Sequence, residues 1–150
     1  MKIVLDTNIL IRANPAASPQ GLARDLLLTI VSGPHVLILS SAILTEVKRV
    51  LTYPHVQARW PLIEKAIDQY LVFLEAASVL AEVPEVFPAV VSDPDDDPIL
   101  QTAIVGKADF LCSRDEAFRH EVVQRVCSAH SIKIVDDITL LQQLRRSGAT

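Results

Sequence analysis

Apolar residues follow two patterns along the chain. Short runs of apolar, often β-branched residues alternate with longer segments in which apolar residues recur every three or four positions. The short runs predict buried strands, and the longer segments predict helices with one buried face. The predicted strands are residues 2–5, 36–39, 78–81, 109–113 and 132–135. The predicted helices are residues 22–31, 41–51, 61–74, 96–106, 115–128 and 138–144, with a proline-containing loop at 14–20 and a break at Tyr53-Pro54.

Strands that alternate with helices are typical of an α/β fold with a parallel sheet. We therefore expect a central, mostly parallel sheet of about five strands with helices on both faces. The length of 150 residues fits one domain, which we expect to span residues 1–150. In sheets of this kind, ligands bind beyond the carboxyl ends of the strands, at the point where the strand order reverses. Polar residues at that edge are therefore the first candidates for a functional site.

Composition narrows the class of protein. Half of the residues are hydrophobic and 21% are charged, which is typical of a globular protein rather than a disordered one. The formal net charge of −4 gives the chain no overall basic character, so any contact with nucleic acid must use a local patch. Cys112 and Cys127 show no metal-binding spacing, and we expect buried thiols. With no recognisable signal segment or membrane-spanning run, we expect a soluble, cytoplasmic protein without a membrane partner.

The most acidic stretch of the chain lies at the start of the helix predicted for residues 96–106. Four aspartates fall within five consecutive positions, namely Asp93, Asp95, Asp96 and Asp97. Carboxylates this close raise each other's pKa and need compensation from solvent, a helix N-terminus or a cation. Taken alone, the stretch is most simply an exposed loop whose acids cap the helix. A divalent-metal site at the helix start is the alternative.

Three further acids favour the metal site. Asp6 ends the first predicted strand, and Asp115 follows the fourth. Glu46 lies early in the helix after the second strand, and Asp96 begins the helix that leads into the fourth. Singly, each acid could be an ordinary cap, turn or solvated helix residue. A parallel sheet would gather all four at one edge, however, where carboxylate oxygens suit Mg²⁺ or Mn²⁺.

The segments that carry these acids resemble the four acidic motifs of the PIN-domain family. They read Ile3-Val-Leu-Asp-Thr-Asn8, Ser41-Ala-Ile-Leu-Thr-Glu46, Asp93-Pro-Asp-Asp96 with Ile99 and Ala103, and Ala108-Asp-Phe-Leu-Cys-Ser-Arg-Asp115. The motifs occur in the right order and span essentially the whole chain. The resemblance is closest to the VapC-like toxins of bacterial and archaeal toxin–antitoxin modules. Two departures affect local geometry: Pro98 follows the acidic run, and Ser113-Arg114 stands where many relatives have a glycine.

The resemblance implies an α/β/α sandwich and an endoribonuclease that depends on Mg²⁺ or Mn²⁺. It implies that the catalytic, metal-binding residues are Asp6, Glu46, Asp96 and Asp115, with Asn8 as an auxiliary residue. It also implies an RNA substrate, an antitoxin protein as partner, and a homodimer. In such an enzyme a carboxylate-held metal lowers the pKa of a bound water and offsets charge on the phosphoryl oxygens. The cations that could form a basic rim for RNA are Arg12, Arg24, Lys48, Arg49 and Arg114.

Among the adjacent aspartates, Asp96 is predicted to be the principal metal ligand. The residues three, four and seven positions after it are all apolar, so this face of the helix should pack against the sheet. The corresponding faces that begin at Asp95 and Asp97 each include a polar residue. The preference of proline for the first helical position would instead make Asp97 the N-cap. Because proline is tolerated throughout the first turn, we favour Asp96.

Other interpretations of the acids stay open at this point. A PIN-like scaffold without catalysis would act only as an interaction module, although intact acids argue against it. A phosphotransfer enzyme of the haloacid-dehalogenase kind needs a second acid where Asn8 stands. A receiver-type signalling domain needs a lysine at the end of the last strand, whereas Lys133 lies inside it. A nuclease assay with and without EDTA separates an enzyme from an interaction module.

Overall fold

A computed structural model describes residues 1–91 and 94–148, and the predicted strands all form in it. The strands are β1 (Lys2–Leu5), β2 (Val36–Leu39), β3 (Ser78–Leu80), β4 (Phe110–Cys112) and β5 (Lys133–Val135). They pair side by side in the order β3-β2-β1-β4-β5, and every pair is parallel. The expected parallel sheet is therefore confirmed.

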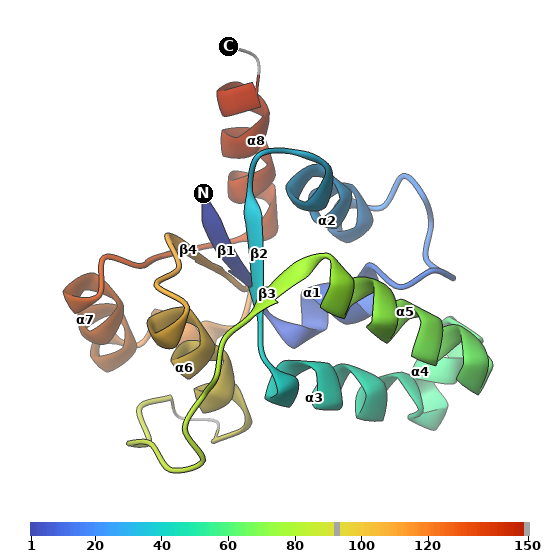
Figure 1. The fold of residues 1–150 in the computed structure, drawn as a ribbon, viewed down its shortest axis with the longest axis horizontal. Coiled ribbons are helices and arrows are strands. Elements are labelled where there is room, and N and C mark those ends of the chain that lie inside the picture. Colours follow the sequence, from blue (N-terminus) through green and yellow to red (C-terminus); the bar gives the residue numbers. More distant parts are fainter. Residues whose placement is uncertain (92–93, 149–150) are drawn as a thin grey trace.

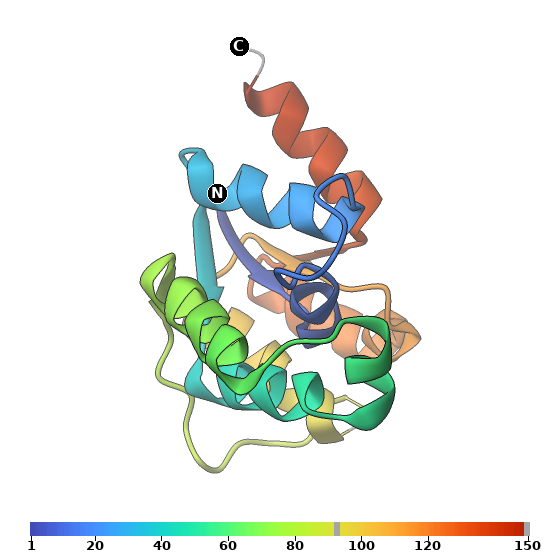
Figure 2. The same cartoon turned by 90° about the vertical axis from the view of Figure 1, so that its right-hand side faces the viewer.

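Helices cover both faces of this sheet, which makes the fold an α/β/α sandwich as expected (Figure 1). The helices are α1 (Thr7–Arg12), α2 (Leu22–Ser32), α3 (Ser41–Leu51), α4 (Pro54–Arg59), α5 (Glu64–Ala76), α6 (Asp97–Val105), α7 (Glu121–Ala129) and α8 (Asp137–Gly148). Helices α2 and α5 lie on one face, and α6 and α7 lie on the other. Helix α8 packs beside α2, where Arg145 pairs with Asp25 (Figure 2).

The order of the strands reverses at β1. The chain steps outward from β1 through β2 to β3, and the next strand, β4, returns to the other side of β1. The carboxyl ends of β1 and β4 lie next to each other, because Leu5 is in register with Cys112. The crevice expected in a sheet of this kind therefore opens where β1 and β4 end.

Two helices were not predicted, and one predicted helix is divided. Helix α1 begins directly after β1, and its residues Ile9, Leu10 and Ile11 are all buried. Helix α4 begins at Pro54, which was taken only as a break. The helix predicted for residues 115–128 forms as a 3₁₀ turn, η2 (Glu116–Arg119), followed by α7, with extended backbone at His120 between them.

The core lies against both faces of the sheet. Val4, Leu5 and Leu39 are fully buried in it, and both cysteines are buried free thiols, as expected. Burial raises the pKa of the Cys127 thiol to about 11. Across residues 1–91 and 94–148, every helix is too short or too polar to cross a lipid bilayer.

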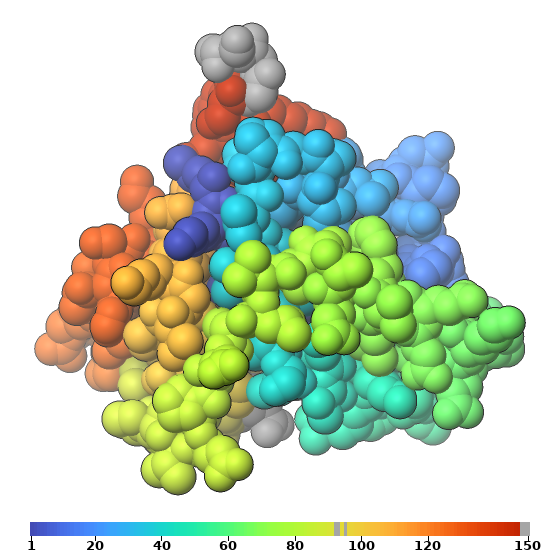
Figure 3. Space-filling model, viewed as in Figure 1, coloured from blue at the N-terminus to red at the C-terminus, as the bar shows by residue number. Residues whose placement is uncertain are grey.

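A long connection joins β3 to the acidic stretch. Residues 81–91 run over the surface beside α6 (Figure 3). The connection returns to the core at Val91, which is 5% exposed. Asp93, which was expected to belong to the acidic stretch, lies outside the described residues. A 3₁₀ turn, η1 (Pro94–Asp96), then leads into α6.

Candidate active site

Asp6 lies at the reversal of strand order, as expected from its place after β1. Its backbone N–H still belongs to the sheet and donates to the carbonyl of Cys112 (2.9 Å). Its side chain caps α1, because Oδ1 accepts the backbone N–H of Asn8 (3.4 Å). The residue is 3% exposed. The end of β1 and the start of α1 thus fix this carboxylate from both sides.

Ser113 connects Asp6 to Asp115. The Ser113 hydroxyl, which is fully buried, donates to Oδ2 of Asp6 (2.6 Å). The Ser113 Oγ atom itself accepts the backbone N–H of Asp115 (3.0 Å). The Asp115 carboxylate in turn caps η2, since its Oδ1 accepts the backbone N–H of Ala117 (2.9 Å). One buried hydroxyl therefore sets the positions of both acids.

The environment of Asp6 opposes its charge. Burial raises the pKa of Asp6 above its ordinary value, and repulsion by Asp115 raises it further. The hydrogen bonds from Ser113 and Asn8, together with the more distant charge of Arg12, lower it again without removing the increase. A carboxylate held in this way gains most from a cation nearby.

Asp6 and Asp115 line a single cavity of about 500 Å³. Asn8 and Arg12 of α1 form one wall, and Arg114 contributes from the segment after β4. Helix α4 also lines the cavity, through His55, Arg59 and the adjoining Trp60. Figure 2 turns this side of the molecule toward the viewer. The cavity therefore combines two acids with three arginines.

Glu46 reaches this site indirectly. It is half-buried on α3, and its Oε2 accepts a hydrogen bond from the hydroxyl of Thr7, the residue after Asp6 (3.1 Å). Its Oε1 lies 3.9 Å from Nη2 of Arg49, one turn further along α3. Glu46 itself lines a neighbouring hollow of about 360 Å³, together with Pro94 and Pro98.

Asp96 and Asp97 occupy different environments at the start of α6. Asp96 is the N-cap and is 8% exposed, and the prolines on either side of it line the hollow that contains Glu46. Asp97 is the first helical residue and is 3% exposed. Its Oδ1 accepts the backbone N–H groups of both Val90 and Val91 (2.9 Å each). Asp97 thus anchors the long connection to α6.

The four acids predicted as metal ligands do not form one compact cluster. Over the described ranges 1–91 and 94–148, no group of three or more His, Cys, Asp or Glu side chains is arranged to hold a metal ion. Asp6 and Asp115 share a cavity, whereas Glu46 and the prolines that flank Asp96 share another. The donor atoms are nevertheless carboxylate oxygens, which suit a hard divalent cation such as Mg²⁺ or Mn²⁺.

The expected basic rim is only partly assembled at the acids. Arg12 and Arg114 line the cavity of Asp6 and Asp115. Arg24 instead donates to the carbonyls of Pro15 and Ala17, and Lys48 pairs with Asp68 (3.4 Å).

Several residues of the site had no recognisable sequence signal. Arg59 and Trp60 follow a proline that was taken as a break, and Ser113 was noted only as a departure from a motif. Asp137, at the start of α8, accepts a hydrogen bond from Nε of Arg114 (2.6 Å). The place of Ser113 at the end of β4, two residues before Asp115, is the one clue that the sequence offers.

A comparison with known families agrees with the geometry of the fold. The family model of the PIN domain matches residues 2–117. No curated protein and no solved structure gives a significant match. The matched segment contains strands β1 to β4 and the four predicted acids, Asp6, Glu46, Asp96 and Asp115.

Proposed function

The chain belongs to the PIN-domain family, whose members are generally nucleases, and we propose that it is an endoribonuclease dependent on Mg²⁺ or Mn²⁺. The observation that carries the proposal is the pair of acids, Asp6 and Asp115, in a cavity that also contains arginines. A phosphodiester substrate brings negative charge, so the acids need a cation and the phosphate needs basic side chains. This cavity contains the groups for both.

The residues that would hold the metal are the four predicted acids, with Asn8 as an auxiliary residue beside them. Asp6 and Asp115 supply carboxylates from adjacent strand ends, and Glu46 and Asp96 supply them from α3 and the start of α6. When bound, a divalent metal lowers the pKa of a coordinated water and offsets charge on the phosphoryl oxygens.

Other residues of the chain would position the metal-binding carboxylates and the phosphate of the substrate. Ser113 fixes Asp6 through Oδ2, and Thr7 fixes Glu46 through Oε2, so the two carboxylates present defined oxygens. Arg12 and Arg114 stand at the wall of the cavity, where guanidinium groups bind phosphate oxygens well because their donors match the spacing of those oxygens. Because these side chains are already held in position, they need to move less when the transition state forms.

The test is cleavage of a mixed single-stranded RNA pool by the purified protein with Mg²⁺ or Mn²⁺. We expect activity that disappears in excess EDTA and falls at least about 100-fold in Asp115→Asn. Asp109→Asn, which changes an acid at the other end of β4, is the matched control and should keep its activity. Equal cleavage in EDTA, or an active Asp115→Asn protein, would contradict the proposal and favour a PIN-like interaction module.

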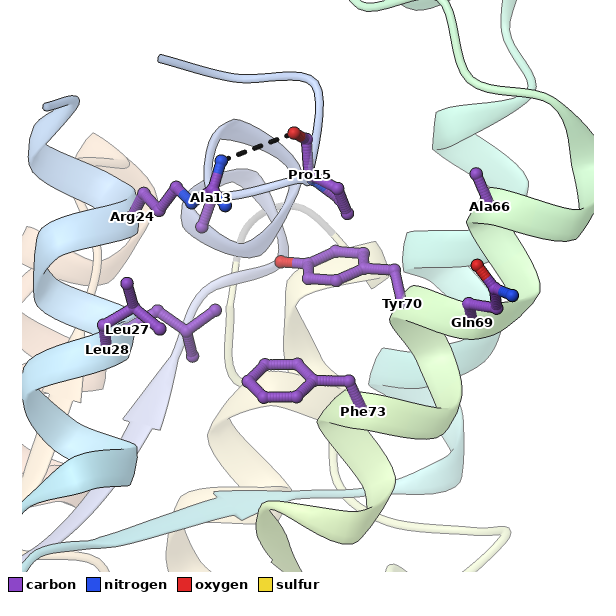
Figure 4. A pocket seen from close by; sticks show the side chains of 9 residues that line it. All are labelled: Ala13, Pro15, Arg24, Leu27, Leu28, Ala66, Gln69, Tyr70 and Phe73. Atoms are coloured by element: carbon purple, nitrogen blue, oxygen red, sulfur yellow. Dashed lines mark hydrogen bonds between the residues drawn. The ribbon is translucent and has the colours of Figure 1, made fainter. Parts of the chain in front are cut away.

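We further propose that residues 1–150 form a single domain and that the protein is the toxin of a toxin–antitoxin pair. We also propose that it forms a homodimer. The motif resemblance supports the toxin role. The dimer is supported by a hollow of about 310 Å³ between α2 and α5, which shares no lining residue with the cavity of Asp6 and Asp115 and is lined in part by Leu27, Leu28, Tyr70 and Phe73 (Figure 4). The Tyr70 hydroxyl donates to the carbonyl of Leu10 (2.6 Å), which leaves a mainly apolar surface for a protein partner.

A further inference from the structure

We propose that single-stranded nucleic acid enters the site over Arg59 and Trp60, with a base stacked on this pair and its phosphates against Arg12 and Arg114. The inference rests on the proposed nuclease function and names how the same site holds its substrate. It concerns residues of α4 and of the segments after β1 and β4 that no motif of the family resemblance includes, apart from Arg114.

The path follows from two adjoining hollows. The cavity of about 500 Å³ that contains Asp6 and Asp115 shares four of its residues with a second hollow of about 380 Å³. The shared residues are Arg12, Arg59, Trp60 and Arg114. The two hollows therefore form one track that leads away from the acids, and its shared section carries three positive charges.

Arg59 and Trp60 form a flat platform in this track. The guanidinium carbon of Arg59 lies 4.4 Å from the centroid of the Trp60 ring, a cation–π arrangement. Trp60 is half-buried and packs against the core, whereas Arg59 is exposed. The ring thus holds a guanidinium plane toward solvent, and such planes stack with unpaired nucleobases. Arg59 forms no ion pair with any carboxylate of the described residues.

Arg114, which lines both hollows of the track, is held in place by a hydrogen bond. Its Nε donates to Oδ1 of Asp137 (2.6 Å), a carboxylate that is 1% exposed and also accepts the backbone N–H of Ile138 (3.1 Å). That bond uses one of the five N–H donors of the guanidinium. Asp137 is therefore a positioning residue, which fixes an arginine at the track while the other donors stay available to a phosphate.

The chemistry favours single-stranded nucleic acid over an acidic peptide. Arginines alone would bind any polyanion, but nucleic acid brings a flat π-face beside every phosphate, whereas a peptide of acidic residues brings none. The bases of a duplex are stacked on each other and do not reach such a platform. The track therefore selects strands whose bases are unpaired.

Tryptophan fluorescence tests this assignment directly, because Trp60 is the single tryptophan of the chain. We would titrate the full-length Asp6→Asn protein, in EDTA to prevent cleavage, with a single-stranded RNA of about ten nucleotides at about 50 mM salt. Saturable quenching is expected with this RNA and much less with the same sequence as a duplex. Fluorescence anisotropy of a labelled RNA follows binding in variants that lack the tryptophan.

Substitutions in the track distinguish the contribution of base stacking to RNA binding from the contribution of charge. Trp60→Ala should weaken binding about 5- to 100-fold, and Trp60→Phe should recover much of that loss. Arg59→Gln, which changes an exposed side chain, should weaken binding through lost stacking, whereas Arg12→Gln should reduce the salt dependence by about one phosphate contact. Arg125→Gln removes an exposed charge from α7 on the far side of the sheet and is the matched control, expected to bind normally.

The outcomes distinguish this inference from the proposed function. RNA cleavage by the unaltered protein together with unchanged binding by Arg59→Gln and Trp60→Ala would overturn the platform and leave the nuclease intact. Quenching by RNA without any cleavage by the unaltered protein would support the platform and overturn the nuclease. Equal quenching by oligoglutamate would overturn the assignment in favour of an acidic peptide.

Discussion

Asp6 shows how a single residue can lower stability in a protein that needs it for function. It is buried, it faces Asp115, and its pKa lies above the ordinary value of 3.8. A raised pKa means that the folded state binds the proton more tightly than the unfolded state does. The resulting stability is fully present below pH 3.8 and is lost as the pH rises through the raised pKa. At neutral pH the Asp6 charge therefore opposes folding.

We predict that Asp6→Asn abolishes RNA cleavage and raises the melting temperature at pH 7 in EDTA. Most substitutions of a buried residue lower the free energy of unfolding, by about 1 kcal/mol on average, so an increase is diagnostic. The difference in melting temperature between the two proteins should shrink as the pH falls toward 4. Asp68→Asn, at an exposed acid, is the control and should change little. A lower melting temperature for Asp6→Asn would show that the Asp6 charge contributes to stability.

Substitutions of Asp96 and Asp97, the two aspartates at the start of α6, should have different effects on stability and on Mn²⁺ binding. Asp97→Ala deprives the backbone N–H groups of Val90 and Val91 of their acceptor and should destabilise the protein by about 2–3 kcal/mol. Asp96→Asn should change stability less but weaken Mn²⁺ binding at least about tenfold, because Asp96 is the predicted ligand. Chemical denaturation and titration calorimetry measure the two effects. Loss of Mn²⁺ binding in Asp97→Ala, with Asp96→Asn binding normally, would reverse the assignment.

At the scale of helices and strands, the sequence predicts the elements whose apolar residues follow a clear pattern, and it misses the helices that lack one. The strands are short apolar runs between polar residues, and each forms close to its predicted bounds. Helix α1 escapes prediction because Ile9, Leu10 and Ile11 are consecutive and all buried, so no polar face marks a helix. Helix α4 escapes because Pro54 ends one helix and starts the next, a position in which proline is common.

The presence or absence of a sequence pattern also explains which residues of the site were predictable. Asp6 and Asp115 were predictable because the carboxyl ends of parallel strands meet at one edge. Arg59 and Trp60 were not, because they lie at the end of α4, a helix that the sequence pattern does not predict. Ser113 was not, because a serine at a strand end has no pattern of its own. Its role follows only from the pairing of β1 with β4, which brings residues 107 positions apart into contact.

Gly106 shows how closely α6 approaches the sheet. A Cβ atom at this position would lie 2.5 Å from Cγ2 of Ile38 on β2 and 2.9 Å from the carbonyl of Thr102. We predict that Gly106→Ala lowers the free energy of unfolding by about 1–3 kcal/mol, because the end of α6 must shift. Chemical denaturation measures the loss.

A double-mutant cycle tests the reason for this loss. Ile38→Ala removes the Cγ2 atom, so Gly106→Ala should cost less in that background. The same cost in both backgrounds would show that the contact with Ile38 is not responsible.

At the scale of the whole molecule, the surface around the hollow between α2 and α5 is unusually apolar. Leu28 is 45% exposed and Phe73 is 40% exposed, and both line the hollow. Exposed apolar residues that gather around a hollow are typical of protein–protein contacts. We predict that the protein is a dimer at tens of micromolar and that Phe73→Glu converts it to a monomer with an unchanged fold.

Analytical ultracentrifugation measures this change, with circular dichroism as the check on folding. The control is Val122→Glu, which places the same charge at an exposed valine of α7, on the other face of the sheet. A dimer that survives Phe73→Glu, or a protein that stays monomeric at high concentration, would exclude this surface.

The central place of β1 has a consequence for the order in which the molecule is made. Strand β1 leaves the ribosome about a hundred residues before β4 and cannot complete its pairing until β4 has also emerged. Pairing over so long a loop is slow compared with local folding. A growing chain therefore exposes Asp6 early but has no partner acid for it until residue 115 is free. The two acids of the proposed nuclease site therefore come together only after β4 and residue 115 have emerged.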